Sequence, residues 1–523
     1  MPKQEADKVQ KSAETIVPQK SVERRNEGRV ELLEQGSYHT GSKRQKMRKR
    51  RKDIKEQQLQ MNFVRECNDS GHCEVKETVV HRLQHGAVSP AWLSACKEER
   101  TLTAGIMEEI ASLSNLQKAY KNVKKNGGCS GTDGMDMKSF RKWARSNMLQ
   151  LQSEMLEGIY EASPVLGIQI PKPQGGYRQL GIPTMRDRLV QQAIHQVLNQ
   201  RYEQIFSEHS YGFRPRRSAH DALLQACRYI EQGKNYVVDL DLEKFFDKVN
   251  HDRLMWLLST RIGDCKLLQL IHKMLKAGML QGGLLSQRIE GTPQGGPLSP
   301  LLSNIVLDEL DKELELRQYS YVRYADDVKI FASTQQQAER IQAKVIRFIE
   351  DKLKLKVNRE KSRVCKGHEL NFLGHSLLKD GTLGLGKSSE QRFKAKLKTI
   401  TSRKRGVSIV QVMKELRDIS RGWLIYYRSA RMQKKIEQID GWLRRRLRCF
   451  RLKQCKRAIG IVRFLRKEGV EESLAWRLAL SGKGWWRLTN SPASTIGMSK
   501  LWFSRMGYQS LTDYYNLVKR FKL

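Results

Sequence analysis

The sequence predicts an α+β fold that is followed by a region made only of helices. Apolar residues recur at intervals of three and four from about residue 107 to 160, and the pattern is helical again from about 390 to 480. Short apolar runs of strand length lie between these regions, at 168–183, 236–240 and 322–331. We therefore expect a sheet-containing part in the middle of the chain and a helical part after it.

The size and charge of the chain point to a nucleic-acid partner. Its 523 residues are enough for two or three packed domains. Lys and Arg number 96 against 56 Asp and Glu, a formal net charge of +40. Such an excess opposes a compact state through self-repulsion unless a polyanion shares it. The alternative partner is an anionic membrane surface. No apolar run approaches the roughly 18 residues of a spanning helix.

Cysteine usage and the N-terminus indicate a reducing compartment. The nine cysteines are scattered and form no Cys-x-x-Cys pair. Cys67 and Cys73, with His72 between them, are too few ligands for a zinc site. The first residues, Met1–Glu5, contain no apolar signal core. We therefore expect free thiols in a cytoplasmic protein.

Residues 1–106 differ in composition from the rest of the chain. They are polar, rich in Lys, Glu and Gln, and include the basic run Lys43–Lys52. Runs of this kind are usually flexible and often bind nucleic acid, so Lys49 and Arg50 are candidate RNA-binding residues. The alternative is an arm that is merely solvated.

Two adjacent carboxylates, Asp326 and Asp327, stand at the tip of an expected hairpin. Val322 precedes this tip and an apolar run follows it, which predicts strand, tight turn and strand. Adjacent acids are costly unless a cation joins them, and Mg²⁺ takes carboxylate oxygen while keeping positions open for substrate phosphates. Two such ions about 4 Å apart can clamp the attacking and leaving oxygens of a phosphoryl transfer. On its own, the pair is also compatible with a solvated turn.

A third carboxylate supports the metal interpretation. The apolar strand Tyr236–Leu240 carries Asp239, and Asp241 follows on the same face because side chains alternate along a strand. Phe246 comes five residues after Asp241, where the chain turns back. A strand-end Asp together with a hairpin Asp pair is the arrangement that a two-metal polymerase needs.

Three blocks of the sequence, taken in order, resemble reverse transcriptases. They are Asp241 with Phe246, the block Gly291–Asn304, and Tyr324–Asp327. In their order, spacing and residue types, they are most similar to the reverse transcriptase–maturases of bacterial group II introns, of the type that lacks an endonuclease. The resemblance implies an RNA-directed DNA polymerase that binds its own intron RNA, assists its splicing and copies it into DNA during retrohoming.

The resemblance covers about residues 107–523 and implies a right-hand polymerase. Fingers and a palm with an antiparallel sheet are expected at 107–380, an α-helical thumb or X (maturase) domain at 381–480, and a tail without an endonuclease domain at 481–523. The implied partners are group II intron RNA, an RNA template with a DNA primer, target DNA and deoxynucleoside triphosphates, with no membrane. The implied location is the bacterial cytoplasm, at the nucleoid when the protein acts on DNA.

By the same resemblance, Asp241, Asp326 and Asp327 are the catalytic residues. They are expected to hold two Mg²⁺, and Leu242 is assigned to the metal site with them. The primer 3′-hydroxyl attacks the α-phosphorus of the nucleotide and pyrophosphate leaves.

Five residues are expected to contact the incoming nucleotide: Lys172, Arg178, Phe246, Gln294 and Lys361. Phe246 stands where the family places an aromatic ring under the sugar, which excludes a 2′-hydroxyl. Lys361 stands where a polymerase lysine can protonate the pyrophosphate leaving group. The alternatives are generic basic strands for Lys172 and Arg178, core packing for Phe246 and a plain surface lysine for Lys361.

Three local patterns add detail to the expected elements. Ser299 followed by Pro300 is typical of a helix cap with proline in the first turn. Residues 353–357 alternate like one more strand. Phe372–His375 resembles the hairpin that grips the primer, and no chemistry is assigned to His375.

The helical region after residue 390 is strongly basic. In Trp442–Arg448, Leu443 and Leu447 lie four residues apart on one helical face and the arginines lie on the others. A-form RNA is bound mainly through shape and phosphates, so the expected RNA contacts are Arg444, Arg445 and Arg448. The alternative is a set of solvated helices. The family often has Trp where this chain has Cys455, which leaves local packing there open.

Two other functions remain open at this point. One is a splicing-only maturase whose polymerase has decayed, which the intact Asp triad argues against. The other is a domesticated reverse transcriptase that serves host defence or repair without an intron.

Overall fold

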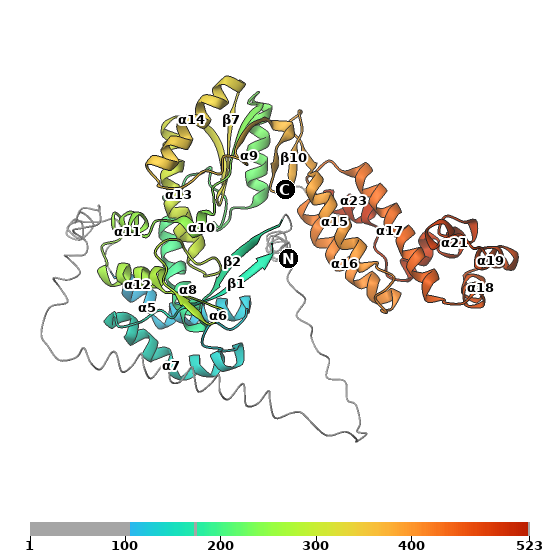
Figure 1. Ribbon diagram of the computed structural model, residues 1–523, viewed down its shortest axis with the longest axis horizontal. Coiled ribbons are helices and arrows are strands. Elements are labelled where there is room, and N and C mark those ends of the chain that lie inside the picture. Colours follow the sequence, from blue (N-terminus) through green and yellow to red (C-terminus); the bar gives the residue numbers. More distant parts are fainter. Residues whose placement is uncertain (1–104, 172–174, 521–523) are drawn as a thin grey trace, which may run out of the picture. The chain divides into compact units, whose positions relative to one another are not determined.

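The computed structural model of this chain describes residues 105–171 and 175–520 (Figure 1). Several expectations concern residues outside these ranges. They are the basic extension with Lys49 and Arg50, the Cys67 and Cys73 pair, and Lys172. These stay predictions.

The helical region expected from residue 107 is present. Its helices are α5 (Ile106–Ala111), α6 (Leu113–Asn126) and α7 (Met137–Glu157). The Ser112 hydroxyl caps α6 by accepting from the Asn115 amide, which satisfies one free N–H of the first turn. The apolar stripe of α6 buries Leu116 and Ala119 against α8 (Met185–Tyr202).

The first sheet contains the strand pair that the sequence predicts. Its order is β2 (Tyr177–Ile182), β1 (Val165–Pro171), β4 (Met279–Gln281) and β5 (Leu284–Ser286). Strands β1 and β2 are antiparallel, with Ile170 opposite Arg178. The β4–β5 hairpin was not anticipated, and β4 pairs parallel to β1.

The second sheet is antiparallel throughout, as expected. Its order is β6 (Ser320–Tyr324), β7 (Asp327–Ala332), β3 (Tyr236–Leu240) and β8 (Arg363–Lys366). Helices α9 (Ala219–Glu231), α13 (Ser299–Leu316) and α14 (Gln335–Asp351) pack against it. Helices α10 (Phe245–Lys248), α11 (His251–Ser259) and α12 (Cys265–Lys276) follow β3 in the chain, and α11 packs against α12 and α13.

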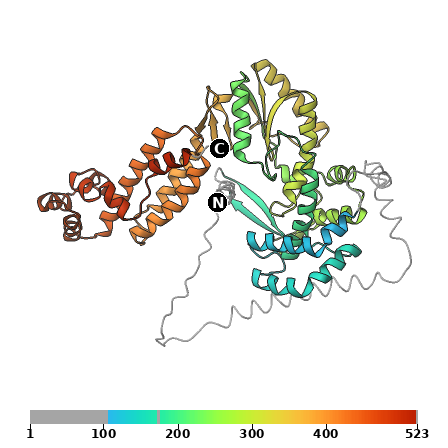
Figure 2. The ribbon, with the colours of Figure 1, turned by 180° about the vertical axis from the view of Figure 1, so that it is seen from behind.

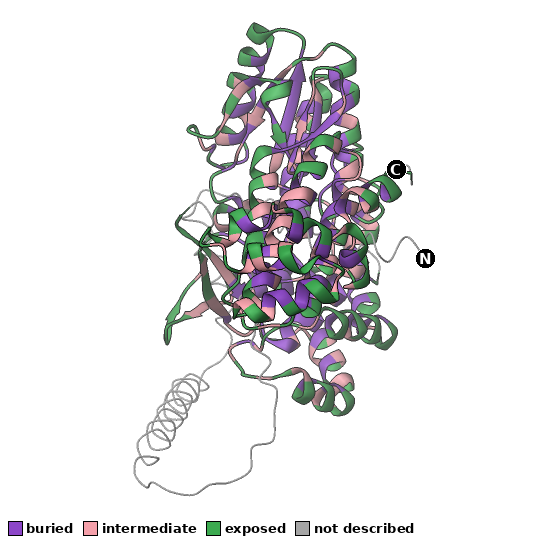
Figure 3. Ribbon diagram, turned by 90° about the vertical axis from the view of Figure 1, so that its right-hand side faces the viewer, coloured by how far each residue is buried: buried purple, intermediate pink, exposed green. Residues whose placement is uncertain are grey.

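Alternation along the central strands divides the core into two clusters. Val238 and Ile330 pack with residues of α13 and α14, whereas Val237 and Phe331 pack with residues of α9. Figure 1 and the view from behind in Figure 2 show α9 and α14 on opposite sides of this sheet. Its strands form a mostly buried layer, and exposed residues lie on the outer faces of the helices (Figure 3). A sheet covered on both faces holds its strand ends rigidly.

A small third sheet leads into the C-terminal helices. It contains β9 (Asn371–Phe372), β10 (His375–Leu377) and β11 (Leu383–Leu385). Leu373 and Gly374 both take positive φ, 48° and 81°, which is the tight hairpin expected here. The helices that follow are α15 (Lys387–Ile400), α16 (Ile409–Tyr426), α17 (Gln433–Gln454), α18 (Ala458–Lys467), α19 (Glu472–Ala479), α20 (Trp485–Leu488), α21 (Pro492–Gly497), α22 (Lys500–Arg505) and α23 (Leu511–Lys519).

Two local expectations were wrong. Residues 353–357 are not a strand: Leu353 and Leu355 are buried beside the sheet, and Val357 makes one isolated bridge with Leu242. The apolar alternation of residues 353–357 also fits a buried loop, because a loop can bury alternate residues without pairing.

Ser299 is not a helix cap either, because it is already the first helical residue and its hydroxyl donates to the Pro293 carbonyl at 2.7 Å.

Within residues 105–171 and 175–520, no helix is both long and apolar enough to cross a membrane.

Candidate active site

The second sheet brings the three expected aspartates to one end. Asp241 directly follows β3, and Asp327 is the first residue of β7. Leu240 of β3 is paired with Val328 of β7, so the next residues outward, Asp241 and Asp327, end the two neighbouring strands together. Asp326 occupies the turn just before β7. Their convergence follows from strand register alone.

The turn that carries Asp326 has an unusual backbone. Tyr324 pairs with Asp327, so Ala325 and Asp326 form a two-residue hairpin turn. Ala325 takes φ 58°, a left-handed conformation that usually requires glycine in the first position of such a turn. Gly212 lies so close that a Cβ on it would meet the Ala325 nitrogen at 2.2 Å. The turn is therefore packed tightly against the neighbouring backbone, which holds it in a conformation that alanine disfavours.

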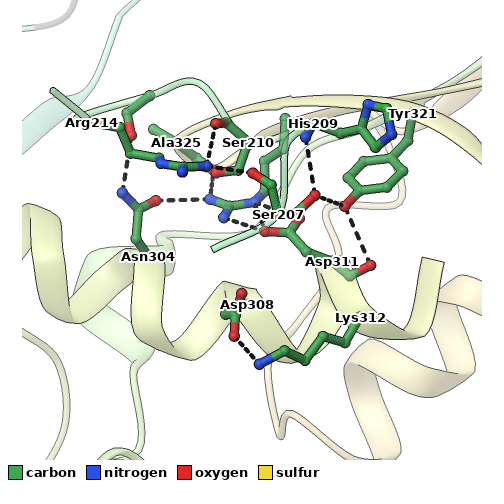
Figure 4. Close-up of polar contacts among 12 residues, drawn as sticks. Ser207, His209, Ser210, Arg214, Asn304, Asp308, Asp311, Lys312, Tyr321 and Ala325 are labelled. Atoms are coloured by element: carbon green, nitrogen blue, oxygen red, sulfur yellow. Dashed lines mark hydrogen bonds and ion pairs between the residues drawn. The ribbon is translucent and has the colours of Figure 1, made fainter. Parts of the chain in front are cut away.

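A buried polar cluster braces this turn from behind (Figure 4). The Arg323 guanidinium donates to the Ala325 carbonyl at 3.0 Å and to Asn304 Oδ1 at 2.9 Å. Its Nε donates to Asp311 Oδ1 at 2.8 Å, and Arg323 and Asp311 are both completely buried. The Asn304 amide in turn donates to the Gly212 carbonyl at 2.9 Å. Helix α13 thus fixes both backbones that meet at the turn.

Electrostatics at the turn favour a bound cation. Burial raises the pKa of Asp326, and the nearby charges of Asp327 and Asp241 raise it further, whereas Arg178 lowers it. Burial also raises the pKa of Asp327, which Lys329 lowers. The three carboxylates repel one another, and a bound divalent cation reduces that repulsion.

The donor chemistry of the triad fits Mg²⁺. Carboxylate oxygens are hard ligands, and Mg²⁺ is usually held by one or two of them together with substrate phosphates and water. In the part of the chain that the structure describes, no three His, Cys, Asp or Glu side chains form a ready-made metal cage. Leu242, which the sequence assigned to this site, has a buried side chain, and its bridge with Val357 lies directly after Asp241.

Two expected nucleotide contacts lie next to the triad. Lys361 Nζ is 3.6 Å from Asp241 Oδ2, and both side chains are largely exposed. The segment around Lys361 is tied to Asp241, whose amide donates to Ser362 Oγ at 3.0 Å and whose carbonyl accepts from the Asn358 amide at 2.9 Å. Arg178, exposed on β2, acts electrostatically on Asp326. Two cations thus flank the acids from different elements.

Phe246 and Gln294 lie on two segments that are bonded together. Phe246 is half-buried in α10, and its ring packs edge-on against Phe245. Its backbone carbonyl accepts a hydrogen bond from the Thr292 amide at 2.7 Å. The Gln294 carbonyl accepts from the Gly181 amide of β2 at 2.9 Å. The loop at 291–296 therefore joins α10 to the strand that carries Arg178.

Lys329 has no role among the residues predicted from the sequence. It lies on β7 and is buried, and its ammonium contacts the carboxylates of Asp327 and of Asp239 on β3. A signal was present, because Lys329 interrupts an apolar strand two residues after Asp327, and Asp239 stands two residues before Asp241.

The arginines of α17 that are expected to contact RNA also have partners within the protein, and their RNA contacts stay predictions. Arg444 pairs with the buried Asp440, and Arg448 donates to the Met498 carbonyl at 3.1 Å. Arg445 lies over the Trp486 ring, 4.0 Å from its centroid, and donates to its carbonyl. Leu443 and Leu447 are buried as expected. These arginines connect α17 to the C-terminal helices.

Comparisons with known proteins cover both halves of the described structure. A family described as reverse transcriptase (RNA-dependent DNA polymerase) matches residues 170–377, and the group II intron maturase-specific domain matches residues 390–469. The first match contains Asp241, Asp326 and Asp327, and the second contains most of α15 and all of α16 to α18.

Individual relatives agree with these matches. Protein YkfC of Escherichia coli (strain K12) is 35% identical over 288 residues, which cover 48% of this chain and 76% of YkfC. Group II intron-encoded protein LtrA of Lactococcus lactis subsp. cremoris is 40% identical over 195 residues, which cover 37% of this chain but only 32% of LtrA. Among solved structures, a partial Cas6-RT-Cas1–Cas2 complex aligns over 47% of this chain and 42% of that chain, at 24% identity and a TM-score of 0.29.

Proposed function

This chain belongs to the group II intron-encoded reverse transcriptases and maturases, and we propose that Asp241, Asp326 and Asp327 form its polymerase centre. As a member of this family, it is an RNA-directed DNA polymerase with a splicing domain. The observation that carries this assignment is the register of β3 and β7, which ends both strands in these acids. The proposed cofactor is two Mg²⁺ ions.

The residues around the triad have separate proposed tasks. When bound, the two ions supply charge stabilisation for the attacking and leaving oxygens. Arg178 and Lys361 neutralise the triphosphate from two sides, and Lys361, beside Asp241, is placed to protonate the departing pyrophosphate. Phe246 limits the space below the sugar, and Gln294 orients the nucleotide or template through its amide. Positioning and charge neutralisation, rather than covalent chemistry, then provide the rate.

The fold supports a right-hand polymerase. We assign the first sheet and its helices to the fingers, the antiparallel sheet to the palm, and α15 to α19 to the thumb. Residues 107–380 then form the polymerase, 381–480 the thumb or maturase domain and 481–523 the tail. The braced turn in the palm sheet gives the acids the rigid support that metal-assisted catalysis requires.

The proposed partners follow from the maturase domain and the charge. They are group II intron RNA, an RNA template with a DNA primer, deoxynucleoside triphosphates and target DNA during retrohoming. The net charge of +40 supports binding of large polyanions. The proposed location is the bacterial cytoplasm, with the nucleoid as the place where DNA is copied.

A two-part assay tests the function. The full-length protein should extend a DNA primer on an RNA template with deoxynucleotides, and chelation of divalent ions should abolish extension. RNA that co-purifies with the protein should contain group II intron domains. Extension that survives chelation would contradict the metal assignment, and co-purified RNA without intron domains would contradict the intron partner.

A further inference from the structure

The buried ion-pair cluster of Lys329, Asp239 and Asp327 lies directly below the proposed metal site. We infer that Lys329 is a positioning residue that weakens and orients metal binding by Asp327, and that Asp239 limits this effect. The inference rests on the proposed metal role of the aspartates. It concerns how strongly this particular centre holds its ions.

The strand register places the cluster. Asp239 of β3 and Lys329 of β7 are paired residues. Asp239 lies two residues further into the sheet than Asp241, and Lys329 lies two residues further into the sheet than Asp327. Because side chains two residues apart share a face, all four side chains lie on one face of the sheet. The Lys329 ammonium contacts one oxygen, Oδ1, of Asp239 and the corresponding Oδ1 of Asp327.

Burial leaves the ammonium few other partners. The Lys329 side chain is 4% exposed, and its third side is covered by the Phe372 ring, whose centroid is 5.9 Å from Nζ. Two of its three N–H donors are taken by the carboxylates of Asp239 and Asp327. Lys329 is therefore fixed in place and cannot swing out to solvent.

The contact with Lys329 divides the two oxygens of Asp327. Oδ1 accepts from Lys329, whereas the structure records no hydrogen bond to Oδ2 within residues 105–171 and 175–520. The Asp327 side chain is 38% exposed, so a metal can reach it. A metal ion that binds Asp327 therefore has one free carboxylate oxygen available, Oδ2. The fixed positive charge of Lys329 on the other side of the carboxylate repels that ion.

Asp239 competes with Asp327 for the same ammonium. While both carboxylates share Lys329, the charge that screens Asp327 is divided between them. Without the Asp239 charge, Lys329 would pair with Asp327 alone and screen it more fully. Loss of Lys329 and loss of the Asp239 charge should therefore change metal affinity in opposite directions.

This opposition separates the inference from a purely structural ion pair. If the cluster only stabilised the sheet, both variants would lower the melting temperature and leave metal affinity unchanged. If Lys329 tunes the site, the signs of the two affinity changes differ whatever happens to stability.

The test measures Mn²⁺ binding to the full-length protein free of nucleic acid, with free Mn²⁺ followed by electron paramagnetic resonance. Lys329→Met should bind Mn²⁺ roughly fivefold more tightly, and Asp239→Asn roughly fivefold more weakly, than the unmodified protein. Lys394→Met is the matched control, because Lys394 pairs with Glu390 within α15, and it should change nothing. The Mg²⁺ concentration for half-maximal primer extension should shift with the same signs.

Changes of equal sign in the two variants, or no change in either, would overturn the inference. If Lys329→Met does not fold, Asp239→Asn decides alone, because tighter or unchanged binding in that variant contradicts the sharing of Lys329. Asp326→Asn in the same assay tests the premise separately. Undiminished Mn²⁺ binding by Asp326→Asn would contradict the proposed metal site, independently of Lys329.

Discussion

Arg323 and Asp311 form a completely buried ion pair behind the turn that presents Asp326, with 2.8 Å between Arg323 Nε and Asp311 Oδ1. The same guanidinium holds the Ala325 carbonyl, so one side chain connects α13 to the turn. A buried charge without its partner is costly, which makes this pair sensitive to single substitutions.

Removal of one partner should destabilise the protein strongly. Asp311→Asn leaves the Arg323 charge buried and should lower the free energy of unfolding by about 3–5 kcal/mol. Urea unfolding measures the change. Arg317→Ala is the control, because Arg317, directly after the end of α13, pairs with Glu313 near the protein surface, and its loss should cost far less stability than Asp311→Asn. Equal losses in the two variants would contradict the importance of the brace.

Phe246 should control the choice of sugar. Phe246→Val opens space below the ribose, so ribonucleotide incorporation should rise relative to deoxynucleotide incorporation. The ratio of kcat/KM for the two nucleotides measures the effect on an RNA template. An unchanged ratio would mean that Phe246, which is half-buried beside Phe245, only packs the core.

His375 should make stability depend on pH. Burial lowers the pKa of His375 to about 3, and its Nε2 has no hydrogen-bond partner in the described part of the chain. The pKa in the unfolded chain is about 6.5, so the unfolded state binds the proton first. Stability is therefore full above about pH 6.5 and falls as pH drops towards 3, by about 2 kcal/mol at pH 5.

The measurement is the free energy of urea unfolding between pH 5 and 7. His375→Phe should flatten its pH dependence, since the ring remains to pack against Tyr427 but no longer titrates. The part that remains is expected from His220 and His251, whose pKa values burial also lowers. An unchanged slope in the variant would contradict this account.

The RNA-binding surface should include exposed lysines of α15 in addition to the arginines expected on α17. Arg448→Gln removes a bond to the Met498 carbonyl and should lower the melting temperature. Lys396 and Lys398 are exposed on α15, so Lys396→Gln with Lys398→Gln should keep the fold and weaken RNA binding. The slope of log affinity against log salt should become shallower by about two units for a duplex. An unchanged slope would place the RNA elsewhere.

Local patterns predicted the elements that position the site. The apolar run at 236–240 and the paired acids at 326–327 predicted both strands, whereas the register that pairs Leu240 with Val328 came only from the structure. The β4–β5 hairpin was missed because its strands have three residues each, too few for a periodic signal. Residues 353–357 were wrongly predicted to be a strand, because a loop whose residues are alternately buried has the same apolar alternation as a paired strand.

Side-chain partners were harder to predict than elements. Lys329 visibly interrupts an apolar strand, but the sequence does not show that its partner is Asp239, which lies 90 residues away. Arg445 was interpreted as an RNA contact, although its nearest groups belong to Trp486, 41 residues later in the chain. Such contacts depend on tertiary packing, which periodicity does not report.

The central claim is that Asp326 is a metal ligand of a DNA polymerase, and one kinetic measurement tests it most directly. Asp326→Asn keeps the shape of the side chain and removes its charge. With Mg²⁺ and an RNA template, kcat/KM for deoxynucleotide incorporation by the variant should fall by at least roughly 100- to 1,000-fold, while its affinity for the primer–template stays unchanged. Incorporation at close to the unmodified rate by a correctly folded Asp326→Asn protein would contradict the claim.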